Sequence, residues 1–174
     1  MKIKSEAGKN IYFEHWSTPL DQAKAVWLET FLMIGNKMHF FFRLEKGAPN
    51  ITYVMSLSRG WPIRFTEEEH AIGCVAKYTV GKNDENIAPV NSHGYQFKTW
   101  KLWGTQYIKE MDSNHALSDY KPRRNKNLFQ HLIETQEEWI EFICTPGVEP
   151  KWKVYKGTDV RSLVRHYTKY RWYR

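Results

Sequence analysis

Cysteine is scarce in this chain, and long hydrophobic runs are absent from it. The 174 residues include only two cysteines, Cys74 and Cys144, which are too few for a disulfide framework. Apolar runs such as 31–34 are no longer than four residues, whereas a membrane-spanning helix needs about 18. Residues 1–6 contain no apolar segment typical of a secretory signal. We therefore expect a cytoplasmic, reduced protein without membrane contact.

Several motifs of known chemistry are also missing. The chain has no Walker-type glycine-rich loop, no GxGxxG, no CxxC, no GxSxG and no HExxH. These absences remove the basis for a kinase, a nucleotide-dependent dehydrogenase or a zinc finger. We predict no metal site and no cofactor, except Mg²⁺ under a nuclease alternative described below.

Positive charge is present in excess and lies at one end. The net charge is +7, yet residues 1–150 contain 18 Lys+Arg and 18 Asp+Glu and are therefore neutral. Residues 151–174 contain eight Lys+Arg and one acid, Asp159. The same 24 residues are rich in tyrosine and tryptophan, and a second basic cluster occupies 121–126. This asymmetry predicts an anionic partner, and nucleic acid is the leading choice.

The fold predicted from periodicity is α+β. Residues 19–34, 127–143 and 159–171 each show apolar side chains at helical spacing, and alternating segments such as 38–45, 51–58 and 151–155 predict strands. We expect an antiparallel or mixed sheet with these three helices packed on one side. No repeat or Gly/Ser linker divides the chain, which favours a single domain over 1–174.

The predicted C-terminal helix presents a cationic ridge beside its apolar stripe, because Arg161, Arg165 and Lys169 are four residues apart. We expect cations to contact phosphate and tyrosine or tryptophan rings to stack on bases. The predicted nucleic-acid-binding residues are Arg123, Arg124, Arg161, Arg165, Lys169, Tyr170, Arg171, Trp172 and Arg174. Whether the partner is DNA or RNA, and the oligomeric state, stay open.

Acidic residues offer an internal alternative. If 127–143 is a helix, four glutamates fall on the face opposite its apolar side. That face is either solvated or paired with the basic tail, which would neutralise the tail. The residues are Glu134, Glu137, Glu138 and Glu141.

The stretch 112–131 resembles the HNH nuclease motif through Asn114-His115 and Asn127-Leu128. The resemblance implies a metal-dependent nuclease with a general base, an orienting residue and Mg²⁺ ligands, which are His115, Asn127, and His131 with Asp112 or Asp119, respectively. The interval from His115 to Asn127 is shorter than the family usually shows. Alternatively, Asn125 or Asn127 caps the helix predicted over 127–143.

A third class of function is open. Exposed aromatic and arginine side chains also suit protein interfaces. The chain is then a protein-binding module, such as an immunity, inhibitor or phage-type accessory protein, that docks on an acidic partner.

Overall fold

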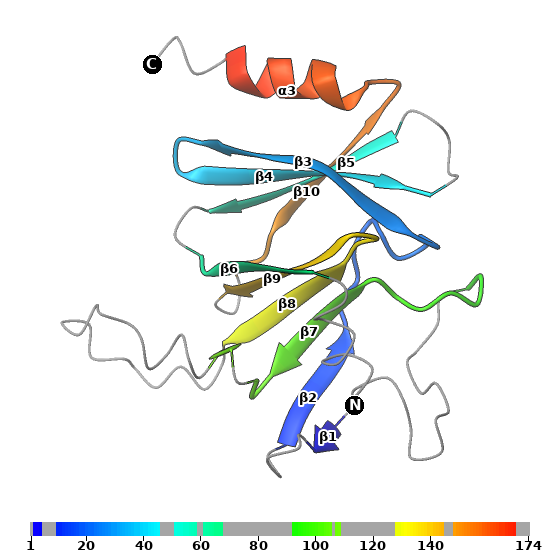
Figure 1. Cartoon of the computed structure of the whole chain (residues 1–174), viewed down its shortest axis with the longest axis vertical. Coiled ribbons are helices and arrows are strands. Elements are labelled where there is room, and N and C mark those ends of the chain that lie inside the picture. The colour runs from blue at the N-terminus through cyan, green and yellow to red at the C-terminus, as the bar shows by residue number, and fades with distance from the viewer. Residues whose placement is uncertain are drawn as a thin grey trace, which may run out of the picture.

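Two antiparallel β-sheets and a helix packed on one of them form three layers among the described residues of the computed structural model (Figure 1). The structure describes residues 2–4, 10–45, 51–58, 61–67, 92–105, 107–108, 128–144 and 148–169. Within these residues the fold is mostly β. It is not the α+β arrangement of three helices on one side of a sheet that the sequence predicts.

The larger sheet has six strands. Its order is β1 (Lys2–Lys4), β2 (Asn10–His15), β7 (Thr99–Trp103), β8 (Phe129–Glu134), β9 (Glu138–Cys144) and β6 (Ile63–Glu67). Every neighbouring pair is antiparallel.

The smaller sheet has four strands, and a helix packs on its side that faces away from the other sheet. Its order is β10 (Lys151–Lys156), β5 (Ile51–Ser58), β4 (Lys37–Leu44) and β3 (Val26–Ile34), again antiparallel throughout. The strands predicted over 38–45, 51–58 and 151–155 are thereby confirmed. Helix α3 (Val160–Lys169) confirms the helix predicted at the C-terminal end.

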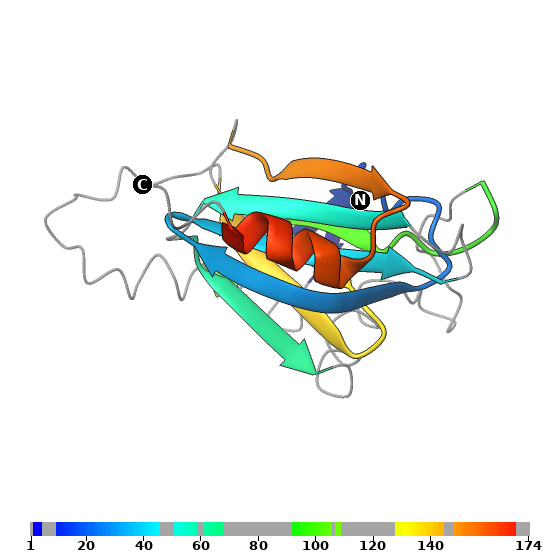
Figure 2. The ribbon, with the colours of Figure 1, turned by 90° about the horizontal axis from the view of Figure 1, so that it is seen from above.

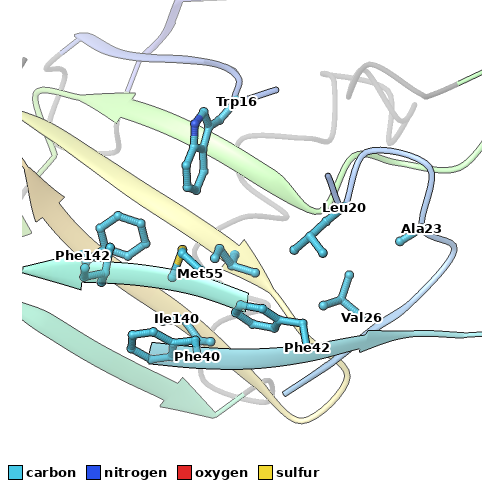
Figure 3. Packing of buried hydrophobic residues seen from close by; sticks show 11 residues of the cluster. Trp16, Leu20, Ala23, Val26, Phe40, Phe42, Met55, Ile140 and Phe142 are labelled. Atoms are coloured by element: carbon cyan, nitrogen blue, oxygen red, sulfur yellow. The ribbon is translucent and has the colours of Figure 1, made fainter. Parts of the chain in front are cut away.

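The main hydrophobic core fills the space between the two sheets. Phe40, Phe42 and Met55 from the four-stranded sheet meet Ile140 and Phe142 from the six-stranded sheet (Figure 3), and all five are fully buried. Burial of large apolar side chains is the dominant favourable term in folding. The two sheets therefore stabilise each other as the layers of a sandwich.

The helix predicted over 19–34 is wrong. Residues 19–22 form a turn, in which the side chain of Asp21 accepts a hydrogen bond from the backbone N–H of Thr18 (3.0 Å). Asp and Thr favour turns for the same reason that they favour helix starts, since their short side chains bond to nearby backbone. Residues 26–34 form β3, and Gly35 lies in the tight turn to β4 with φ of 59°.

An irregularity in β3 explains the misleading spacing. The register against β4 shifts between Leu28 and Thr30, and the extra residue moves the following side chains to the opposite face. Leu28 packs on the core between the sheets, whereas Leu32 packs under α3. A bulged strand covered on both sides therefore shows apolar residues three or four apart, as a helix does.

The helix predicted over 127–143 is also wrong. Strands β8 and β9 form a hairpin, in which Glu134 pairs with Trp139. Ile133 lies in the core between the sheets, and its neighbour Leu132, on the opposite face, is buried as well. Because both faces of this hairpin are covered, polar and apolar residues do not alternate. The glutamates therefore do not form the single helical face that the sequence suggests.

Candidate functional site

Helix α3 packs through a short apolar stripe on the side of the four-stranded sheet that faces away from the main core. Leu163 is buried against Phe41 and Val54. The hydroxyl groups of Tyr155 in β10 and Tyr167 in α3 lie 2.9 Å apart. Figure 2 looks down on the helix, which lies over the four-stranded sheet. The last strand and the helix that follows it are thus fixed in one surface.

The cationic ridge of α3 is present and faces away from the sheet. Arg161, Arg165 and Lys169 are all exposed, and at about 100° per residue they follow one side of the helix. Among the described residues, no carboxylate forms an ion pair with any of the three. Their charge is available to a partner from outside.

Asp159, the single acid of the tail, has a structural role. Its carboxylate accepts hydrogen bonds from the backbone N–H of Ser162 (2.9 Å) and from the Ser162 hydroxyl (2.7 Å). These bonds lower the pKa of Asp159. It therefore caps the first turn of α3, where a negative charge is favourable.

Lysines of β10 extend the positive surface onto the sheet. Lys151 pairs with Ser56 and Lys153 pairs with Val54, which packs under α3. Because alternate residues share a face of a strand, Lys151, Lys153 and Tyr155 all lie on the helix side of the sheet. Both lysines are exposed. We call α3 together with this side of the four-stranded sheet the outer face.

Two of the four glutamates expected to neutralise the tail, Glu134 and Glu141, have other partners. Glu134 accepts a hydrogen bond from Nζ of Lys98 (2.6 Å). Glu141 is buried and pairs with Arg64, and it also accepts hydrogen bonds from Gln130 (2.5 Å) and the hydroxyl of Thr66 (3.1 Å). Both residues belong to the six-stranded sheet and its local contacts. In the described part of the chain, neither forms an ion pair with a tail cation.

A histidine lies inside the outer face, beside α3. His39 is only 8% exposed, a hydrogen bond of 2.8 Å links its Nδ1 to Oγ of Ser56, and its ring meets that of Tyr167 edge-on at 4.7 Å. Burial lowers the pKa of His39, and the positive charges of Lys37 and Lys153 lower it further. His39 is therefore neutral at pH 7.

The structure brings together three of the sequence-predicted binding residues and leaves the others outside the described residues. Arg161, Arg165 and Lys169 share α3. Those outside the description are Arg123, Arg124, Tyr170, Arg171, Trp172 and Arg174, as well as the candidate catalytic residues His115 and Asn127.

Sequence reasoning missed four residues of the outer face, namely Lys37, His39, Lys151 and Lys153. A signal for the last two was present, because the alternation over 151–155 places them on one face of a strand. No comparable signal pointed to Lys37 and His39. They join the surface only through the pairing of β4 with β5 and of β5 with β10.

The position of His131 speaks against the HNH interpretation. His131 is fully buried in β8, its Nδ1 lies 3.1 Å from the sulfur of Cys144, and its ring stacks on Phe142. Burial, with a smaller contribution from Lys101, lowers the pKa of His131 to about 3. Burial is also the main cause that raises the pKa of Cys144 to about 12. Both side chains are neutral members of the core, and a hydrolytic metal needs an accessible imidazole.

The described residues contain no group of three or more His, Cys, Asp and Glu side chains placed to hold a metal ion. None of their helices is long and apolar enough to cross a lipid bilayer. The chain matches no family model, no curated protein and no solved structure. Any function must therefore be argued from the outer face itself.

Proposed function

We propose that this protein binds nucleic acid through the outer face. The observation that carries the proposal is that Arg161, Arg165 and Lys169 are exposed without an acidic partner among the described residues, on a helix that packs on the same side of the sheet as Lys151 and Lys153. A surface of one sign attracts the phosphate backbone and accelerates association.

Each group of side chains has a separate task in this proposal. The ridge of α3 contacts consecutive phosphates, because residues four apart rise by about 6 Å along a helix. Lys151 and Lys153 contact phosphates of the same nucleic-acid strand from the sheet. Beyond α3, Tyr170 or Trp172 stacks on an unpaired base, and the basic segment 121–126 adds phosphate contacts through Arg123 and Arg124.

The test is a salt titration of binding by fluorescence anisotropy, with single- and double-stranded DNA and RNA of equal length. The variant Arg161→Gln/Arg165→Gln/Lys169→Gln removes three charges from the ridge. The logarithm of the binding constant then falls less steeply with the logarithm of salt, by about 2 for a single strand and nearly 3 for B-DNA if all three contact phosphate. Lys24→Gln is the control, because Lys24 is exposed in the connection between β2 and β3. An unchanged slope in the triple variant refutes the proposal.

A protein-binding module that docks on an acidic partner is the second candidate. The observation that favours it is a group of exposed apolar side chains, Phe31 (45% exposed), Met33 (55%) and Phe65 (40%). The rings of Phe31 and Phe65 are 5.4 Å apart, although they belong to different sheets. Affinity capture with and without nuclease treatment separates the two candidates. A partner that survives digestion and is lost on Phe31→Ser supports the second one.

A further inference from the structure

The outer face contains a compact group of phosphate-binding side chain types around His39. The strand registers place His39, Ser56 and Lys151 in one row across β4, β5 and β10. Lys37 lies two residues before His39 on the same face of β4, and Lys153 lies one row further along β10. Two of these lysines, Lys37 and Lys153, lie near enough for their charges to act on the ring of His39.

Hydrogen bonding leaves one ring nitrogen of His39 available. Nδ1 is occupied by Ser56, while Nε2 has no hydrogen-bond partner in the part of the chain that the structure describes. The other neighbours of the ring are Tyr167 from α3, which contacts it edge-on, and Leu32 of β3, which pairs with it. Tyr167 stays neutral, because burial raises its pKa. Within the described residues no carboxylate forms an ion pair with Lys37 or Lys153.

We propose that Lys37, Lys153 and His39 form a subsite for one phosphate group, and that His39 takes up a proton when the phosphate binds. The two ammonium groups and Nε2–H of His39 donate hydrogen bonds to the phosphate oxygens. Ser56 fixes the ring orientation through Nδ1. The subsite rests on the proposed function, since it receives one phosphate of the bound nucleic acid.

The proton uptake follows from the charges near His39. In the free protein burial disfavours the imidazolium form, and the positive charges of Lys37 and Lys153 disfavour it further. A phosphate between them offsets the positive charge and adds a negative partner, which favours the charged form. The pKa of His39 then rises on binding, so phosphate binds more tightly as the pH falls.

The experiment is an NMR titration of the His39 ring with inorganic phosphate as the probe, at constant ionic strength set with NaCl. His39→Gln identifies the resonance. We expect the pKa of His39 to rise in phosphate. In Lys153→Gln the pKa of His39 is already higher without phosphate, phosphate binds about tenfold more weakly, and the phosphate-dependent rise disappears. Lys156→Gln is the matched control. It removes an equal charge from the same strand, at its end, where Lys156 pairs with Ile51.

Two results overturn the subsite. One is a His39 pKa that phosphate does not move. The other is an equal loss of the phosphate effect in Lys153→Gln and Lys156→Gln, because that result indicates diffuse charge and no defined site. If nucleic acid still binds with the expected salt dependence, the proposed function stands and only the subsite fails. If phosphate shifts His39 while no nucleic acid binds at low salt, the subsite holds and the proposed function fails.

A second arm identifies the source of the phosphate. Two oligonucleotides of identical sequence, one with a 5′-phosphate and one with a 5′-hydroxyl, are compared by the same shift of the His39 resonance. An equal shift supports a backbone phosphodiester as the occupant. A shift with the 5′-phosphate alone supports a terminal phosphate. No shift with either refutes a nucleic-acid phosphate as the occupant.

Discussion

Mild acid should destabilise this protein through His131, the most deeply buried ionisable imidazole of the structure's described part. Its side chain is fully buried between Cys144 and the rings of Trp16 and Phe142. Burial is the main cause and Lys101 the second cause that lower the pKa of His131 from 6.5 to about 3. The folded protein therefore keeps His131 neutral under conditions in which the unfolded chain protonates it.

The sign and the size of the stability change follow from this difference in the pKa of His131 between the folded and the unfolded chain. Between pH 6.5 and pH 3 the unfolded chain binds one proton more than the folded chain, so stability is full above pH 6.5 and falls as the pH decreases. The slope is at most about 1.4 kcal/mol per pH unit, which amounts to about 2 kcal/mol between pH 6.5 and pH 5. His39 adds a slope of the same sign, because its pKa is lowered too.

Urea unfolding at several pH values between about 7 and 5 measures the effect, and two variants separate the histidines. His131→Leu loses the larger part of the slope, even though it changes the stability at every pH. His39→Gln retains the contribution of His131. A full slope in His131→Leu, or an NMR titration in which the His131 ring protonates near its ordinary pKa, refutes the reasoning.

Three further predictions concern packing, reactivity and backbone conformation. Leu163→Ala costs about 2–4 kcal/mol, since the side chain is buried between α3 and the sheet; hydrogen exchange of the α3 amides checks it, and unchanged protection contradicts the docking. In a Cys74→Ser background Cys144 does not react with a thiol reagent until the protein unfolds, because it is buried and its pKa is about 12; rapid labelling of the native protein argues against this burial. Gly35→Ala lowers the melting temperature, because φ of 59° costs a residue with a Cβ about 1 kcal/mol; an unchanged value excludes this turn geometry.

The chain sequence predicts local strands better than it predicts the large elements. The strand over 51–58 is visible because turn residues precede it and its apolar residues recur within one short run. The segment 26–34 is not visible as a strand, because one of its faces covers the sandwich core and the other lies under α3. Gly35-Asn36 between two apolar segments is nevertheless a hairpin signal. Glycine is equally suitable at the end of a helix, so the same pair is also consistent with the helix predicted over 19–34.

The residues of the candidate site also differ in how far the sequence predicts them. The ridge of Arg161, Arg165 and Lys169 depends only on helical spacing, and the sequence shows it directly. Lys153 and His39 come together through a sheet order in which the last strand joins β5 and not a neighbour in sequence. That pairing connects residues about a hundred positions apart. Long-range contacts of this kind follow from the burial of whole faces and leave no trace in a local pattern.

Two tryptophans provide an internal optical reporter of the sandwich. The indole rings of Trp16, next to the six-stranded sheet, and Trp152, in the four-stranded sheet, have their centroids 6.0 Å apart. Their near-ultraviolet circular dichroism depends on this fixed arrangement and disappears once the sheets separate, even where the strands themselves persist. This signal therefore reports whether the two sheets are packed together, without any added label.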